Sequence, residues 1–252
     1  MGTDKTSQIV WHDLFTTDRE RAMSFYQSLA AWEYVTEHAT DFAWGGGTQD
    51  YVLALKEGEA GAGIVTPPPD MSTGWVAYVE VNDVDATAVL TETLAGEVLR
   101  PPFDVPGVGR NALLRDPNGA TIGVAMSRHN FPVPRRQFGN EVYLSADRSF
   151  PRDFYARLFD WEFSKPQVDE NHSRNTIAVQ GQIVAATWDD SPLDNLSSRW
   201  LPMIKVIDPL GSLRSVPDLV GVKLGQMSDA HVPQDLLFLE DADGELVCLT
   251  GA

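Results

Sequence analysis

Hydrophobic and polar positions recur along this chain in short stretches, each of which predicts one strand or one helix. The first stretch, IVWHDLFT at 9–16, predicts a strand, whereas the apolar residues of DRERAMSFYQSLAA at 18–31 recur at helical spacing. Three short strands are expected next, near 42–44, 51–55 and 61–65. The predicted order is therefore one strand, one helix and three strands.

The same order is predicted three more times along the chain. The second unit is a strand at 75–81, a helix at 83–96 and strands near 97–99, 111–115 and 121–125. In the remaining chain, strands are expected at 140–146, 175–180, 182–188, 200–207 and 241–249, with a helix in SFPRDFYARLFDW. Together these elements predict an α+β fold built from four βαβββ units.

Long-range repeats in the sequence indicate a duplication. FYQSLAAWEY at 25–34 returns as FYARLFDWEF at 154–163, with five identities at an offset of 129 residues. GWVAYVEVND matches RWLPMIKVID at an offset of 125 residues, and the turns DPNG and DADG share that offset. Offsets of half the chain predict two tandem domains, at 1–126 and 140–252, joined by a linker at 127–139.

Composition narrows the possible partners. The net charge of −17 disfavours phosphate backbones and anionic lipid, so neither nucleic acid nor membrane is expected as a partner. The one cysteine, Cys248, rules out an intrachain disulfide and a cysteine-rich zinc site. No stretch has the length and apolarity of a signal peptide or a membrane span, which predicts a cytoplasmic protein. A homodimer is left open.

The repeated phrases carry a family resemblance. FY…WE after each first helix, VNDVDAT at 81–87, PPFDVPGVGR at 101–110 and the DPNG and DADG turns resemble the vicinal oxygen chelate superfamily. That superfamily includes glyoxalase I, extradiol dioxygenases and bleomycin-resistance proteins, and the chain looks like its tandem two-domain glyoxalase-like members. The resemblance implies four units paired into two glyoxalase-like domains, in which each sheet curls into a cup for a ligand and often a divalent metal.

The resemblance also implies where metal ligands would lie. The corresponding positions on the first, last and remaining strands are Trp11, Asn140, Gly123, Cys248, Gly63 and Ala186. The strands that begin at Trp75 and Trp200 offer no histidine at their starts. Only Asn140 and Cys248 carry weak donors, fewer than the three protein ligands of a catalytic zinc. No cofactor is therefore expected, and a divalent metal is disfavoured.

His12, Asp13 and Glu141 are the candidate catalytic residues. A shift of one residue in the register would turn His12 and Glu141 into the cups, because side chains alternate along a strand. In the register as counted, His12 faces the other side of its strand and makes an ordinary hydrogen bond. Asp13 and Glu141 are candidates for a general base or a substrate anchor, or for structural acids at the start of their strands.

The candidate ligand-binding residues are Trp11, Trp75, Arg110, Asn140, Trp200 and Cys248. Tryptophans along a cup would suit a flat apolar or aromatic ligand, and Arg110 could reach an acidic or carbonyl group. The alternatives are core tryptophans, a surface ion pair for Arg110 and a buried apolar role for Cys248.

Three functions remain open from the sequence. The first is a metal-independent binder of a small, apolar or aromatic molecule, of the bleomycin-resistance kind. The second is a glyoxalase-like lyase or isomerase, or an oxygenase, using His12, Asp13 or Glu141. The third is an interaction protein in which the cups no longer bind a ligand. The sequence leaves open whether any reaction is catalysed.

Overall fold

The computed structural model describes residues 5–40, 47–145, 150–165, 167–168, 173–188, 197–216, 227–229 and 232–251. The first half contains β1 (Ile9–Phe15), α1 (Arg19–Ala30), β2 (Glu33–Ala39), β3 (Gln49–Lys56), β4 (Glu59–Val65), β5 (Gly74–Glu80), α2 (Val84–Thr93), β6 (Glu97–Val105), β7 (Gly109–Arg115) and β8 (Thr121–Ser127). The second half contains β9 (Phe138–Leu144), α3 (Arg152–Phe159), β10 (Glu162–Phe163), β11 (Gln167–Val168), β12 (Ser173–Val179), β13 (Gln182–Trp188), β14 (Arg199–Val206), α4 (Pro209–Ser215), β15 (Met227–Asp229), β16 (Val232–Glu240) and β17 (Leu246–Gly251). The strand expected near 42–44 lies outside the described residues.

The described strands form two large sheets. One has the order β2-β3-β4-β1-β5-β8-β7-β6, and the other has the order β10-β12-β13-β9-β14-β17-β16-β15. In both sheets the first strand of a unit pairs in parallel with a later strand of the same unit, as β1 does with β4 and β9 with β13. This confirms the α+β class of repeated βαβββ units.

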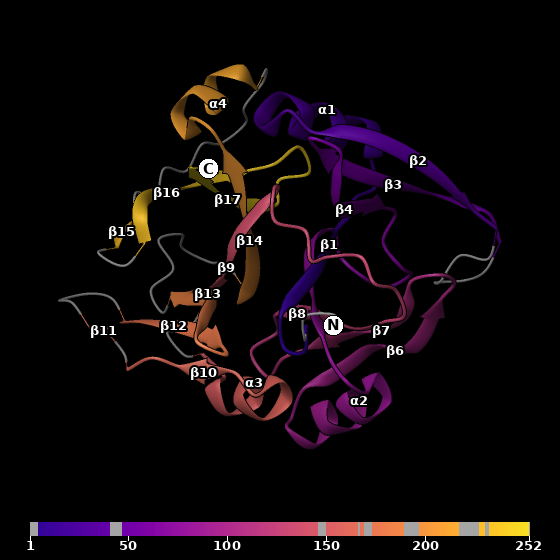
Figure 1. Ribbon diagram of the computed structural model, residues 1–252, viewed down its shortest axis with the longest axis vertical. Helices are drawn as coiled ribbons and strands as arrows, with labels where there is room; N and C mark the ends of the chain where they lie inside the picture. Colours follow the sequence, from indigo (N-terminus) through magenta and orange to yellow (C-terminus); the bar gives the residue numbers. More distant parts are fainter. Residues whose placement is uncertain are drawn as a thin grey trace. The chain divides into compact units, whose positions relative to one another are not determined.

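Helix α1 forms where its sequence pattern predicts. The Asp18 side chain accepts a hydrogen bond from the backbone N–H of Arg21, which satisfies a donor in the first turn. The helix ends at Ala31, whose φ of 54° is left-handed. Its buried face carries Phe25 and Tyr26 into an apolar cluster with residues of β1, β3 and β4. Figure 1 shows α1 beside β4.

Strand β6 is longer than its sequence predicts. The segment that contains Pro101 and Pro102 is part of this strand, with register shifts between Val98 and Arg100 and between Arg100 and Phe103. The strand lies at the end of its sheet, where a proline costs no ladder hydrogen bond on the outer side. Strand β2, at the opposite end, has no strong hydrophobic alternation and was not expected from the sequence.

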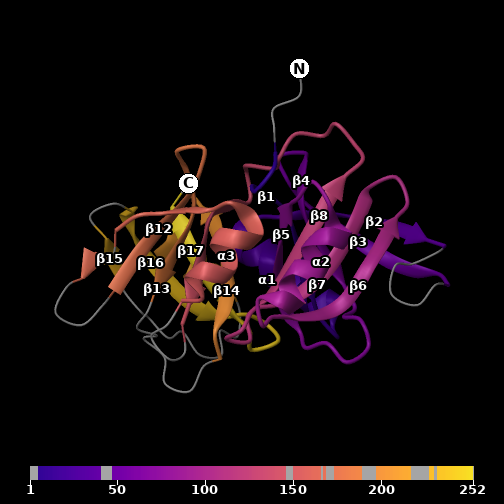
Figure 2. The ribbon, with the colours of Figure 1, turned by 90° about the horizontal axis from the view of Figure 1, so that it is seen from below.

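Contacts divide the chain into two compact units. One comprises residues 1–11, 76–133 and 140–200, and the other comprises 12–75, 134–139 and 201–252. Each unit has its own apolar cluster, and each draws on both halves of the sequence repeat. In the first unit α2 packs against β6, β7 and β8 (Figure 2). The domain boundaries taken from the repeat remain a prediction.

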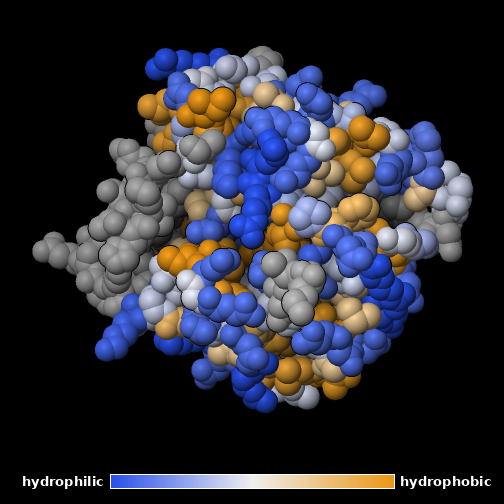
Figure 3. Space-filling view, viewed as in Figure 1, coloured by the Kyte–Doolittle hydropathy of each residue, from blue (hydrophilic) through white to orange (hydrophobic). Residues whose placement is uncertain are grey.

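The surface is mostly polar on the face shown in Figure 3. Hydrophilic residues predominate there, and hydrophobic residues form small, separate patches. Within the described part of the chain, no helix combines the length and apolarity needed to cross a membrane.

Candidate functional site

A buried chain of hydrogen bonds links α1 to the turn before β17. The hydroxyl of Tyr26 donates to the Asp241 carboxylate at 2.7 Å, and the indole N–H of Trp75 donates to the Tyr26 oxygen at 2.8 Å. The ring of Trp32 stacks on Tyr26 with centroids 5.0 Å apart. The FY…WE phrase is thus a structural motif, in which its tyrosine and tryptophan pack together.

The duplicated phrase builds the same arrangement in the other compact unit. Tyr155 donates to Asp116 at 2.9 Å, and the indole of Trp200 donates to the Tyr155 oxygen at 2.7 Å. Trp161 stacks on Tyr155 with centroids 5.4 Å apart. Tyr143 adds a second hydroxyl bond to Asp116 at 2.9 Å. Trp75 and Trp200 therefore hold equivalent places in the two apolar clusters.

The two aspartates are held by their own turns. One oxygen of Asp241 accepts backbone N–H bonds from Asp243 and Glu245, and one oxygen of Asp116 accepts the equivalent bonds from Asn118 and Ala120. Burial raises the pKa of Asp241 to about 6 and raises the pKa of Asp116 in the same direction. Each carboxylate joins a turn to a helix through its two oxygens.

Strand β1 presents its candidates on opposite faces. His12 stacks on Phe138 with centroids 3.9 Å apart and meets Trp75 edge-on at 6.5 Å, next to the apolar cluster that contains α1. Asp13 lies on the other face, because adjacent side chains alternate. Glu141 on β9 corresponds to His12 in the repeat, and it pairs in register with Ala185 of the other core.

Asp13 forms a close polar pair over a glycine. Tyr51 of β3 donates a 2.6 Å hydrogen bond to Asp13, and Gly63 of β4 lies opposite Asp13 in register. A Cβ atom on Gly63 would collide with the Tyr51 hydroxyl and reach 2.5 Å from the Asp13 carboxylate. The tyrosine and the aspartate therefore take the space that a side chain at position 63 would need.

The side of β1, β3 and β4 turned away from α1 is here called the distal face, defined by Asp13, Tyr51, Leu53 and Gly63. Leu53 lies opposite Gly63 in register, and Leu55 follows it on the same side of β3. Tyr51, Leu53 and Leu55 are half-buried, while Asp13 is 5% exposed. The distal face thus combines an apolar row with one polar pair.

A related arrangement occurs in the other compact unit. Tyr78 of β5 pairs in register with Gly123 of β8, and a Cβ atom on Gly123 would collide with the Tyr78 ring. Tyr78 is 1% exposed. Here too a tyrosine ring occupies the space of a side chain that the sequence lacks.

Three of the other predicted ligand-binding residues lie on three different strands. Trp11 is half-buried and shares the side of β1 that carries Asp13. Asn140 is half-buried at the matching position of β9. Cys248 is fully buried on β17, in register with Met203 and Phe238.

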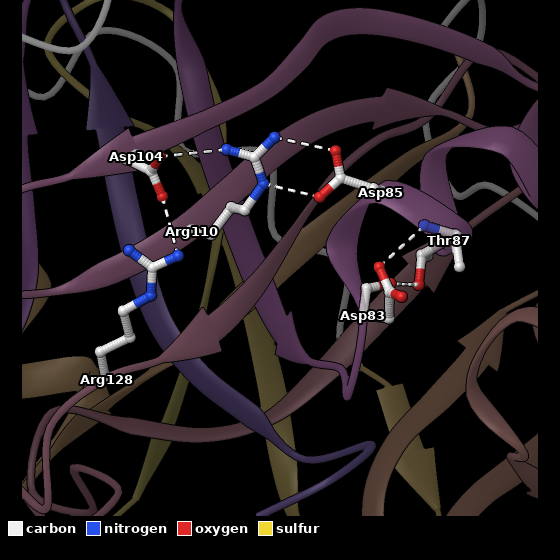
Figure 4. Close-up of polar contacts among 7 residues, drawn as sticks. Asp83, Asp85, Thr87, Asp104, Arg110 and Arg128 are labelled. Carbon is white, nitrogen blue, oxygen red and sulfur yellow. Dashed lines mark hydrogen bonds and ion pairs between the residues drawn. The ribbon is translucent and has the colours of Figure 1, made fainter.

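Arg110 is engaged by acidic side chains. Its guanidinium forms two hydrogen bonds to Asp85 of α2, at 2.7 and 2.8 Å, and a third to Asp104 at 3.2 Å (Figure 4). Arg128 contacts the other oxygen of Asp104 at 3.0 Å. The hydrogen bonds from Arg110 lower the pKa of Asp85. This network ties α2 to the β6–β7 hairpin, as the ion-pair alternative for Arg110 expects.

The residues at the expected ligand positions do not fit a divalent metal. Gly63 and Gly123 have no side chain, and a tyrosine covers each of them. Trp11 offers only an indole, which leaves Asn140 and Cys248 as donors. Among the residues that the structure describes, no three His, Cys, Asp or Glu side chains cluster as a metal site would require. The absence of a bound metal stays a prediction.

Sequence reasoning missed two features of these sites. Tyr51 carries no local signal, since its importance depends on Gly63 in the neighbouring strand. Asp116 and Asp241 did carry a signal, because both recur at the same offset as the neighbouring strands. They were interpreted as turn residues only, and their bonds to the helix tyrosines were not foreseen.

Relatives with similar sequences include a protein provisionally named as a glyoxylase and proteins named for anthracycline biosynthesis. A Mycobacterium tuberculosis protein provisionally named as the glyoxylase CFP32 is 38% identical over 118 residues, which is 45% of this chain and 43% of that protein. The anthracycline biosynthesis protein DauV of a Streptomyces species is 30% identical over 129 residues, 45% of each chain. The matched segment thus spans less than half of these relatives. No family model matches the chain.

Solved structures with the same fold are extradiol dioxygenases. The 2,2′,3-trihydroxybiphenyl 1,2-dioxygenase of Sphingomonas wittichii superposes with a TM-score of 0.64 at 15% identity, covering 98% of this chain and 91% of that one. The catechol dioxygenase BphC gives 0.65 at 13% identity, covering 98% and 87%. This is the fold of the vicinal oxygen chelate proteins. These structures and the relatives named as glyoxylases support the resemblance of this chain to that superfamily.

Proposed function

We propose that the chain binds a small, flat organic molecule against the distal face without using a metal ion. The observation that carries this proposal is the 2.6 Å hydrogen bond between Tyr51 and Asp13, which lies over Gly63. The hydroxyl donates its proton to the carboxylate, so the pair presents acceptor oxygens to a ligand at one point beside an apolar row. Small-molecule sites commonly combine apolar area with a few polar groups that fix orientation.

The chemistry of the distal face favours an aromatic ligand. Leu53 and Leu55 line one side of β3 beside Tyr51, and all three side chains are half-buried. Such a row suits stacking and burial of a planar ring system. The relatives named for anthracycline biosynthesis also support an aromatic ligand, since anthracyclines are fused-ring aromatic compounds. A role like that of the bleomycin-resistance proteins, holding a compound without altering it, agrees with this chemistry.

A metal-independent lyase or isomerase is the second candidate, and the same pair favours it. An aspartate 2.6 Å from a tyrosine hydroxyl has the geometry of a general base beside a proton donor. His12 and Glu141 would contribute less, because they lie on the faces that pack toward the apolar cores. An oxygenase that needs iron would lack ligands at the expected positions.

A binding titration tests the proposal. Protein dialysed against EDTA is titrated with a fluorescent anthracycline as the probe, for wild type, Tyr51→Phe and Asp13→Asn. Saturable binding by wild type is expected, weakened about tenfold in either variant, because Tyr51→Phe removes the hydroxyl and Asp13→Asn removes the charge of its acceptor. Phe131→Ala, at an aromatic residue that is 70% exposed, is the control and should bind as wild type does.

The same samples separate the two candidates. Recovery of the probe unchanged, by mass spectrometry, supports binding alone, whereas conversion that Asp13→Asn abolishes supports the lyase or isomerase. Equal binding by wild type and both variants, or no saturable binding, would contradict a site on the distal face. Circular dichroism checks that each variant remains folded.

A further inference from the structure

Sheets end in edge strands, whose outward backbone groups can pair with another chain unless something prevents it. The two sheets of this protein end in β2, β6, β10 and β15. Strand β6 contains Pro101 and Pro102 and has two register shifts. Strand β15 has three residues, and the edge beside β12 is divided between β10 and β11, of two residues each. Three of the four edges are therefore short or irregular.

Strand β2 is neither short nor irregular, although it carries two acidic residues, Glu33 and Glu37. Its seven residues, EYVTEHA, pair with β3 in an unbroken antiparallel register from Glu33↔Leu55 to Ala39↔Gln49. Five of the seven are exposed and none is proline. Val35 is 49% exposed, so this edge strand presents an apolar side chain to solvent. Within the described residues, β3 is the strand that pairs with β2, and the opposite edge is bare.

We propose that β2 is a dimerisation edge, which pairs antiparallel with β2 of a second copy of this chain about a two-fold axis at Thr36. This register places Thr36 opposite itself, Tyr34 opposite His38 of the second copy, and Val35 opposite Glu37 of the second copy. Glu33 then lies opposite Ala39 of the second copy. Threonine pairs and aromatic pairs are favourable across antiparallel strands, and no two carboxylates are opposed.

Charge selects this register over its neighbours. An axis at Val35 would set Glu33 opposite Glu37 on both sides of the interface. An axis at Glu37 would set two copies of Glu37 directly against each other. Like charges directly opposite one another are destabilising across strands. The sequence of β2 is therefore self-complementary in one of these three registers, which is what an isologous two-fold interface requires.

Light scattering after size exclusion tests the interface. Wild type at about 100 μM and 150 mM salt, where surface repulsion is screened, should have twice the chain mass of 27.7 kDa. Val35→Glu opposes carboxylates at two places and should shift the protein to monomer. Adding Glu37→Lys to Val35→Glu should restore the dimer by pairing opposite charges. Val89→Glu, on an α2 residue that is 64% exposed, is the matched control and should remain dimeric.

A cysteine variant tests the register. Thr36→Cys brings two thiols together at the axis, within the roughly 7 Å between Cα atoms that a disulfide tolerates, so oxidation should give a covalent dimer. Glu33→Cys places its thiols roughly 20 Å apart and should stay uncrosslinked. A monomeric wild type would overturn the proposal. So would a dimer that Val35→Glu leaves intact or that Val89→Glu disrupts equally, since either result places the interface elsewhere.

Discussion

Tyr26 and Asp241 lie 215 residues apart in the chain and are joined by a buried 2.7 Å hydrogen bond. The repeat places Tyr155 against Asp116 in the same way, at 2.9 Å. In both cases the tyrosine of one repeat half bonds the aspartate of the other half. The two halves of the sequence therefore stabilise each compact unit together.

Tyr26→Phe should destabilise the fold. The substitution removes a donor from the buried Asp241 carboxylate and an acceptor from the Trp75 indole, which leaves two buried polar groups less well satisfied. We expect a loss of about 1–3 kcal/mol in the free energy of unfolding, measured by urea denaturation. Tyr34→Phe is the control: Tyr34 is half-buried and donates to the Met23 carbonyl, so a smaller loss is expected. Equal losses in the two variants would contradict a special role for the buried pair.

Asp241 should make stability depend on pH. Burial raises its pKa to about 6, above the value of about 3.9 in an unfolded chain. The folded protein therefore holds this proton more tightly, so Asp241 stabilises the fold below pH 4 and loses that contribution as the pH rises through 6.

Asp241→Asn removes this dependence and provides the comparison. The difference in unfolding free energy, wild type minus variant, should fall by about 1 kcal/mol between pH 5 and pH 7. This pH range stays above the pI of about 4.5, and so avoids the pH at which the protein would tend to precipitate. A difference that rises over the same range would mean that the native carboxyl group is ionised more readily than in the unfolded chain.

Gly63→Ala should disturb the distal face. The new methyl group would collide with the Tyr51 hydroxyl and press on Asp13, so the pair must separate. We expect a loss of about 1–3 kcal/mol in stability, as for other overpacked sites, together with weaker probe binding. Tyr51→Leu in the same chain should recover part of the stability and none of the binding. A Gly63→Ala protein as stable as wild type would show that the space over Gly63 is not filled in solution.

The fold could be predicted from the sequence because its signals are local and repeated. The helix that begins after Asp18 has an N-cap residue and a face of apolar residues that becomes buried. The strand that precedes it, β1, is marked by a run of apolar residues. Strand β2 was missed because five of its seven residues are exposed and it shows no apolar alternation. The strand around Pro101 was missed because its prolines are tolerated only at a sheet edge, which the sequence does not reveal.

The site could be predicted only in part. Counting along β1 predicts that His12 faces the side of the strand opposite Trp11, because alternation is a property of the strand itself. In the structure His12 stacks on Phe138, and Asp13 bonds Tyr51 on the other face. The partnership of Asp13 with Tyr51 depends on register between β1, β4 and β3, which no single segment encodes. For the same reason Trp75 looked like a possible ligand contact, whereas its indole bonds Tyr26 within the core.

The most direct test of the account is the metal content of the protein, measured by elemental mass spectrometry after purification without tags or chelators. Glycine stands at two of the expected ligand positions, Gly63 and Gly123, so too few donor side chains converge for a catalytic metal site. We therefore expect less than about a tenth of an equivalent of any transition metal per chain. A content of about one or two equivalents, lost with a ligand position such as Asn140 or Cys248, would contradict the account and make metal-dependent catalysis the leading function.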